Sequence, residues 1–179
     1  MPLVRGVTHT SLARFGRTLL ILVIAVSATA CAIPGSPVSP DTVASASSPL
    51  NLEADTAFCV SEINRYRASV GDEQLARSAR LDAFSTEAAR VDGEAHRPHH
   101  YFVTTNGGPN IARAQNVIPF WKLSDYGSVR RIVREGLEMM WAEGPGGGHY
   151  DTMRGAFSEV GCGVYVAPNG EVTVSQDFR

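Results

Sequence analysis

The chain has 179 residues, and its 16 Lys and Arg against 18 Asp and Glu give a formal net charge of −2. Residues 1–30 contain three Arg and no acid, so their removal would lower the formal net charge to −5. Nucleic-acid binding depends on clustered Lys and Arg. The sequence has no basic stripe, and we therefore exclude nucleic acid as a partner.

The first 30 residues have the pattern of an export signal. Arg5, Arg14 and Arg17 precede an apolar run at 19–26, and small residues lead to Cys31. This pattern is typical of export signals, and the run is shorter than the roughly 20 residues that cross a bilayer. Cys31 after small residues looks like a bacterial lipobox, which predicts a lipoprotein signal peptide at 1–30 and a lipid on Cys31. Secretion with Cys31 unmodified and an uncleaved anchor are the alternatives.

Residues 31–52 are rich in Pro, Ser and other small residues. Such a segment cannot bury enough apolar surface to fold, so we expect a flexible tether between Cys31 and the rest of the chain. The tether would hold the domain away from a membrane surface. The remaining residues, 53–179, are enough for one domain.

Three amphipathic helices are expected within this domain. Apolar residues recur at helical spacing over 57–67, 80–93 and 128–142, and each set lies on one face of a helix. The third stripe is the clearest of the three.

The hydrophobic period changes to two after these helices. Over 160–166, Val and Cys alternate with small or polar residues, and Asn169-Gly170 follows. Asn-Gly is a strong signal for a hairpin turn, and 172–178 continues as the returning strand. Helices first and an antiparallel hairpin last imply an α+β layered domain.

Cys31 is one of three cysteines in the sequence. If Cys31 carries a lipid, Cys59 and Cys162 remain as a pair. Two such cysteines often form a disulfide in an oxidising compartment, which is the pairing we predict. Two buried free thiols are the alternative, because Cys is among the most buried residue types.

Glu143 and His149 flank a Gly-rich segment between the third helix and the hairpin. Glycine lets the chain bring side chains close together with little steric cost. Buried Glu and His are costly unless they are paired or bound to a ligand. We therefore expect a functional site in this segment.

Several segments, taken in chain order, form a recognisable set. They are Asn64-Arg-Tyr-Arg67 with the loop after it, 81–89, Gly148-His-Tyr150 with Met153, Glu159-Val-Gly-Cys-Gly163 and Gln176-Asp-Phe178. Together they resemble the signature segments of the CAP superfamily, also called SCP/TAPS (cysteine-rich secretory, antigen 5 and pathogenesis-related 1 proteins). The resemblance covers residues 55–179. It implies a three-layer α-β-α sandwich with a C-terminal β-hairpin, which agrees with the element order above.

The resemblance also implies a surface cavity lined by two His and two Glu, which binds a divalent metal in some members. His149 lies in the Gly-His-Tyr signature. Glu143 follows the Trp that ends the third helix, one residue sooner than is usual. In Ala114-Gln-Asn-Val117, Gln115 stands where the family has its other Glu.

The second His of the cavity must come from the segment His96-Arg-Pro-His-His100. Of His96, His99 and His100, we favour His100. A histidine taken alone in such a segment is more often solvated than bound to a ligand.

The zinc set that follows is His100, Glu143 and His149, with an open fourth position. A neutral amide at Gln115 contributes much less than a carboxylate, so we expect weak zinc binding or none. The alternative has no metal: His149 hydrogen-bonds Glu143 or Gln115 and holds the loop in place.

Two functions of different classes remain. The first is a non-enzymatic binding module on the cell envelope, and the resemblance links it to sterols or other lipids. The second is a hydrolase, such as a peptidase, in which zinc in the same cavity would activate water. The sequence shows no Ser or Cys nucleophile arrangement, and Cys59 and Cys162 lie on apolar faces where a reactive thiolate is not expected. We therefore favour the binding module.

Overall fold

The computed structural model describes residues 50–179. The predicted signal peptide, the lipid on Cys31 and nearly all of the tether lie outside these residues and stay predictions. Within residues 50–179, no helix is both long enough and apolar enough to cross a membrane.

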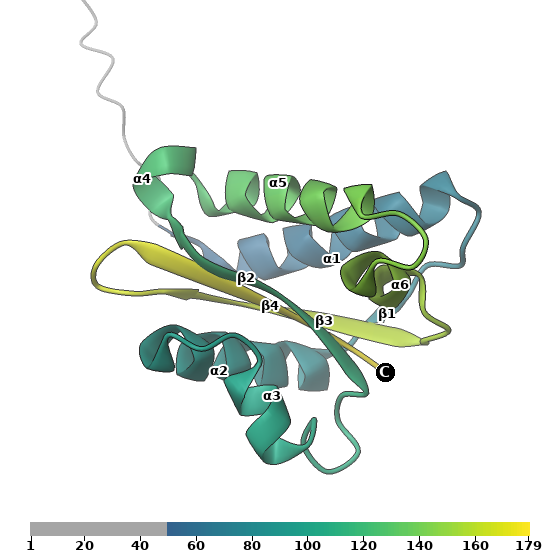
Figure 1. Cartoon of the computed structure of the whole chain (residues 1–179), viewed down its shortest axis with the longest axis horizontal. Coiled ribbons are helices and arrows are strands. Elements are labelled where there is room, and N and C mark those ends of the chain that lie inside the picture. The colour runs from purple at the N-terminus through teal and green to yellow at the C-terminus, as the bar shows by residue number, and fades with distance from the viewer. Residues whose placement is uncertain (1–49) are drawn as a thin grey trace, which may run out of the picture. The chain divides into compact units, whose positions relative to one another are not determined.

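Residues 50–179 form a four-stranded sheet with helices on both faces (Figure 1). The elements are, in chain order, α1 (Leu52–Ser69), β1 (Ala76–Arg77), α2 (Ala79–Ala95), α3 (His100–Thr105), β2 (Ala114–Lys122), α4 (Leu123–Tyr126), α5 (Val129–Ala142), α6 (Gly148–Arg154), β3 (Glu159–Val166) and β4 (Glu171–Phe178). Helices α1 and α5 cover one face, and α2 with α3 covers the other. The predicted α+β class and α-β-α layering are confirmed.

The strands are arranged in the order β1-β3-β4-β2. β1 pairs with β3 in parallel, and the other neighbours are antiparallel. β3 and β4 form the predicted hairpin, with Val164 opposite Val174 and the turn closed by a bond from Gly170 N–H to the Ala167 carbonyl. The sequence analysis did not predict β2, which is an edge strand beside β4.

Helix α1 begins at Leu52, five residues before the apolar spacing starts. The side-chain oxygen of Asn51 accepts a hydrogen bond from the Ala54 N–H at 3.1 Å, which satisfies one of the free donors at a helix start. The first turn, Leu52 to Asp55, lies before the helical stripe, so periodicity could not place it. The folded domain therefore takes in the last residues of the predicted tether.

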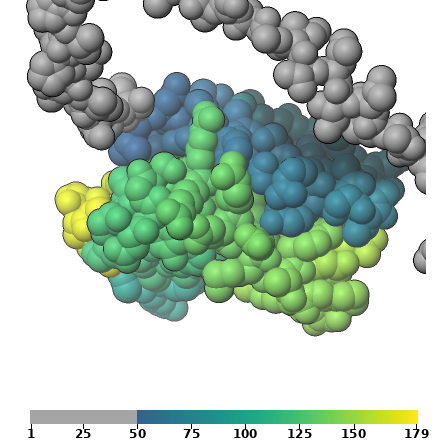
Figure 2. All heavy atoms as spheres, turned by 90° about the horizontal axis from the view of Figure 1, so that it is seen from above, coloured from purple at the N-terminus to yellow at the C-terminus, as the bar shows by residue number. Residues whose placement is uncertain are grey.

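The main hydrophobic core lies between the sheet and the α1–α5 layer, where these two helices lie side by side (Figure 2). Its fully buried side chains include Ile63, Ile132, Leu137, Met153 and Phe178. Burying a side chain of this size contributes about 1.5–3 kcal/mol, so this core contributes strongly to the stability of the domain.

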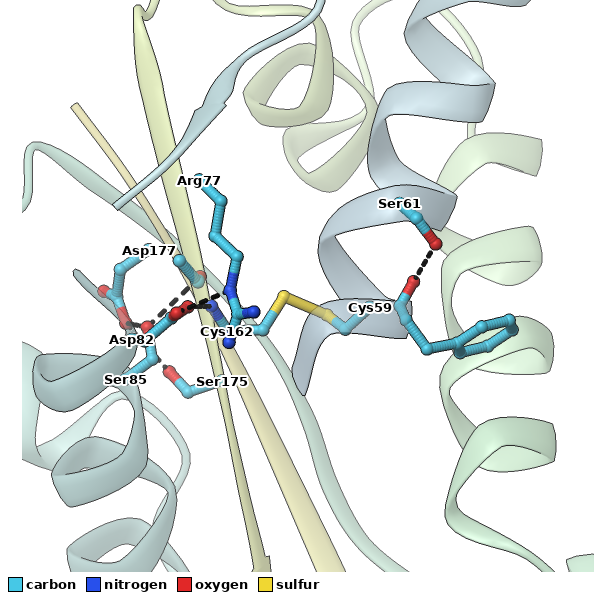
Figure 3. The surroundings of a disulfide bond; sticks show 10 residues. Cys59, Ser61, Arg77, Asp82, Ser85, Cys162, Ser175 and Asp177 are labelled. Atoms are coloured by element: carbon cyan, nitrogen blue, oxygen red, sulfur yellow. Dashed lines mark hydrogen bonds and ion pairs between the residues drawn. A yellow bond between two sulfur atoms is a disulfide. The ribbon is translucent and has the colours of Figure 1, made fainter. Parts of the chain in front are cut away.

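The predicted disulfide between Cys59 and Cys162 is confirmed. It joins α1 to β3 across the core, and both residues are fully buried (Figure 3). On the far side of β3, the Asp82 carboxylate accepts a hydrogen bond from the Cys162 N–H at 3.0 Å. Cys162 is thus held from both layers at once.

Helix α2 packs directly on the other face of the hairpin. A Cβ atom at Gly163 would come within 2.1 Å of the α2 backbone at Ser85 and Thr86, so only glycine allows this close approach. The contact brings Ser85 against β4, where it becomes part of the buried polar cluster described in the next section.

Candidate functional site

Glu143 and His149 lie next to each other at the end of the α5 layer. Glu143 directly follows α5, and His149 is the second residue of α6, a short helix where the sequence predicted only a Gly-rich loop. The backbone turns back within five residues, and a Cβ atom at Gly147 would lie 2.4 Å from the Glu143 Cβ. Glycine at this position is what lets Glu143 approach α6.

Two hydrogen bonds join the pair. Glu143 Oε1 lies 2.5 Å from His149 Nδ1, and Glu143 Oε2 accepts from the His149 backbone N–H at 3.0 Å. The hydrogen bond from the His149 side chain lowers the pKa of Glu143 below its usual value, so Glu143 is a carboxylate near neutral pH. Because a carboxylate only accepts, the hydrogen of this contact lies on His149 Nδ1. Of the two contacts that the sequence allowed for His149, the structure shows the one with Glu143.

A groove of about 380 Å³ adjoins this pair. Apart from Glu143 and His149, its lining is apolar, with residues from β2 and α5: Val117, Ile118, Pro119, Trp121, Gly136, Met139 and Met140. Met139 is 63% exposed at the surface of α5, whereas Ile118 is buried. The groove therefore runs from an exposed apolar side chain to a polar pair.

Gln115 and His99 form a second contact, on the side of β2 that faces α2. His99 Nδ1 lies 3.0 Å from Gln115 Oε1. His100, the histidine favoured for the cavity, begins α3, and its side chain makes no hydrogen bond or ion pair within residues 50–179. Its place in the cavity stays a prediction. His99 has a left-handed backbone with φ 61°, and this turn decides which of two adjacent histidines faces Gln115.

Gln115 also contacts a buried carboxyl group that the sequence analysis did not identify. Its Nε2 donates to Asp177 Oδ1 at 3.0 Å, while the hydroxyls of Ser85 and Ser175 donate to Oδ2 at 2.7 and 3.2 Å (Figure 3). Burial raises the pKa of Asp177 to about 7, and its hydrogen bonds oppose that rise. The available signal was the alternation of β4, which places 173, 175 and 177 together on the α2 face.

The same region contains a second buried acid, Asp92 of α2. Its Oδ1 accepts from the Tyr101 N–H at 2.8 Å, and its Oδ2 has no hydrogen-bond partner within residues 50–179. Burial raises the pKa of Asp92 as well, against the effect of hydrogen bonds from the backbone at Tyr101 and His99. The α2 face of the site thus holds two carboxyl groups whose pKa values are raised by burial.

The sequence model of the cysteine-rich secretory protein family, CAP, matches residues 60–178. The chain belongs to this family. Among solved structures, an outer surface protein of Borrelia burgdorferi has a similar fold, with a TM-score of 0.52 and 16% identity over 73% of this chain and 96% of that chain. No curated protein matches the sequence. At this identity, the structural likeness supports the fold of the CAP domain and nothing further.

The structure does not bring the three predicted zinc ligands together. Within residues 50–179, no three His, Cys, Asp or Glu side chains lie close enough to hold one metal ion. Glu143 directs both carboxylate oxygens at His149, and Gln115 directs its amide at His99 and Asp177. Zinc binding by His100, Glu143 and His149 stays a prediction.

Proposed function

We propose that this CAP protein is an exported, non-enzymatic binding module, anchored at the cell envelope through a lipid on Cys31, that holds an amphipathic lipid in the groove beside His149. The export pattern of residues 1–30 and the small residues before Cys31 support the location. The Cys59–Cys162 disulfide agrees with it, because such bonds persist mainly in oxidising compartments.

The apolar groove that ends in the Glu143–His149 pair is the observation that carries the ligand class. Its volume of about 380 Å³ lies within the roughly 300–1,000 Å³ of small-molecule sites, which are mostly apolar with a few polar groups that orient the ligand. An apolar body in the groove would gain from burial. A hydroxyl or other donor at its end would meet Nε2 of His149. A lipid with one polar head, such as a sterol, has both parts.

Binding of a fluorescent sterol or fatty acid to the full-length protein tests the ligand class. Met139→Glu places a charge at the exposed end of the groove and should weaken binding about tenfold or more, because a charged group next to the ligand must be desolvated. Val103→Glu is the matched control, since Val103 is 70% exposed on α3, away from the groove. Equal binding by both variants, or no binding by the parent, would contradict the proposal.

The anchor has its own test. Cys31→Ser should release the protein from membranes into the soluble fraction, and retention on membranes would count against a lipid at this residue. The zinc-dependent hydrolase is the alternative, and within residues 50–179 no group of three metal-ligating side chains supports it. Native mass spectrometry of protein purified without chelator distinguishes the two functions. A one-to-one zinc mass that His149→Ala abolishes would favour the hydrolase over the binding module.

A further inference from the structure

A second hollow lies apart from the groove, beside the loop that joins α3 to β2. Its volume is about 510 Å³, and it is lined by residues 105–113, with the exception of Gly107, and by Arg179. The Arg113 N–H donates to the Phe178 carbonyl at 2.8 Å, which fixes the loop against the end of β4 near the C-terminus (Figure 1). An adjoining hollow of about 330 Å³ shares Arg113 and Arg179.

Two arginine residues line this place. The Arg113 side chain forms no hydrogen bond or ion pair with any of residues 50–179, and the nearest carboxylate oxygen to Arg179 is that of Glu159 at 3.8 Å. Arg80 donates to the Pro109 carbonyl at 3.4 Å and so brings a third guanidinium beside the loop. Glu159 is the one acid among the described residues that line the two hollows. Of the two arginines that line the hollow, Arg113 has no side-chain partner within residues 50–179, and Arg179 pairs with Glu159.

The loop adds neutral hydrogen-bond donors. Thr105, Asn106 and Asn110 line the hollow, and both asparagines have left-handed backbones, with φ 51° and 56°. Within residues 50–179, the Asn110 N–H makes no hydrogen bond. The other backbone N–H groups of 106–113 donate to carbonyls of the chain, and Pro109 has none. The Asn110 N–H and the Arg113 guanidinium are therefore the donors left for an acceptor such as an oxyanion.

We propose that this hollow binds the oxyanion group of a ligand, a phosphate or carboxylate, between Arg113, Arg179 and the loop 105–113. The planar guanidinium matches both groups through paired N–H donors. This site differs from the groove in chemistry as well as place, since its lining is polar where the groove is apolar. The same oxyanion occurs on soluble metabolites and on anionic lipid headgroups.

Titration of the isotope-labelled full-length protein with inorganic phosphate tests the site by NMR. Backbone amides of residues 105–113 should shift, and Arg113→Gln with Arg179→Gln should weaken the affinity about tenfold or more, the loss expected for charged hydrogen bonds. The matched control is Arg131→Gln with Arg134→Gln, which removes the same charge from the exposed side of α5. Equal weakening in both double variants, or shifts outside this loop, would overturn the site.

Chemical modification of arginines in the protein without substitutions tests the site even if the double variant misfolds. Phenylglyoxal modifies accessible arginines, and phosphate should slow its reaction at Arg113 and Arg179 but not at Arg134. Equal rates with and without phosphate at all three residues would overturn the proposal.

Vesicles separate the two sources of the oxyanion. The Cys31→Ser variant removes insertion through an N-terminal lipid, so sedimentation then reports on the protein surface. If it sediments with phosphatidylglycerol and not phosphatidylcholine vesicles, and the Arg113/Arg179 double variant does not, the oxyanion belongs to a lipid headgroup. Phosphate binding without sedimentation assigns a soluble anion. If neither probe binds, the proposal fails.

Discussion

Gln115 donates a hydrogen bond from its side-chain nitrogen to the Asp177 carboxyl group, 3.0 Å away. This contact gives a physical reason for an amide at a position where the resemblance to CAP proteins leads one to expect Glu. A carboxylate there would face a second, fully buried carboxyl group. The amide instead satisfies Asp177 with one end and His99 with the other.

Gln115→Glu should therefore destabilise the protein. The new carboxylate would lose the donated hydrogen bond and stand about one hydrogen-bond length from Asp177, where two acids cannot both be charged. We expect a loss of about 2–3 kcal/mol at pH 8 and a smaller loss at pH 5, because protonation of one acid relieves the repulsion. Urea unfolding at the two pH values measures this, with the exposed Gln74→Glu as control. An unchanged or increased stability at pH 8 would show that Asp177 does not constrain residue 115.

Asp177 itself should make stability depend on pH. Its pKa is about 7 in the folded protein, because of burial, against about 3.9 in an unfolded chain. The folded state therefore binds this proton more tightly, so the contribution of Asp177 to stability is fully present below about pH 4 and is lost as the pH rises to about 7. Asp92 acts in the same direction, since its pKa is also raised by burial. The other titratable residue beside these acids is His99, which contacts Asp177 indirectly through Gln115.

Asp177→Asn removes the charge that must otherwise be buried above pH 7. Ser85 can accept from the new amide while it donates to the Gly161 carbonyl, 3.2 Å away. We expect the variant to be more stable than the parent at pH 8, by about 1–4 kcal/mol, and to show a flatter pH profile between 4 and 7. Thermal unfolding across this range is the measurement. A profile parallel to that of the parent would mean that Asp177 is ionised throughout.

The sequence predicted the fold better than it predicted the site. Long elements carry a periodic signal, which is why the three long helices and the β3–β4 hairpin were found. The strand β2 was missed because it contains Asn116 and Pro119 and bends at a bulge between Ile118 and Trp121. Helices α3, α4 and α6 have four to seven residues, too few for a hydrophobic period to be recognised.

Within the site, contacts between residues close in the chain were easier to anticipate than distant ones. Glu143 and His149 are six residues apart across glycines, so a contact was a natural expectation. The partner of Gln115 was not, because His99 and His100 are adjacent and only the left-handed turn at His99 orients one of them. Asp177 lies 62 residues from Gln115, and its buried position depends on strand pairing and on α2, which no local pattern reports.

Reduction of the disulfide should cost a large part of the stability. The bond between Cys59 and Cys162 spans 103 residues, and closing a loop of this size restricts the unfolded chain by about 4–5 kcal/mol in the chain-entropy description. Urea unfolding with and without reductant should show this difference. The Cys59→Ala, Cys162→Ala double variant is the control, because reductant should leave it unchanged. A midpoint that does not move on reduction of the parent would mean that the helix α1 is held by packing alone.

Arg67 is the residue we expect to couple the first helix to the His149 side of the groove. It is buried, and its guanidinium donates to the Met153 and Gly155 carbonyls, at 2.8 and 3.1 Å, at the end of α6. A further bond, from Nε to the Glu73 carbonyl at 2.8 Å, ties the same side chain to the loop after α1.

Arg67→Lys keeps the charge but cannot reach three carbonyls at once. It should lower stability by about 3 kcal/mol, the loss expected for buried charged hydrogen bonds, and weaken binding in the groove because α6 carries His149. Urea unfolding and sterol binding measure the two effects, and Arg65→Lys, on the exposed face of α1, should change neither. If Arg67→Lys unfolds at the same urea concentration as the parent, the three carbonyl contacts do not hold α6 in place.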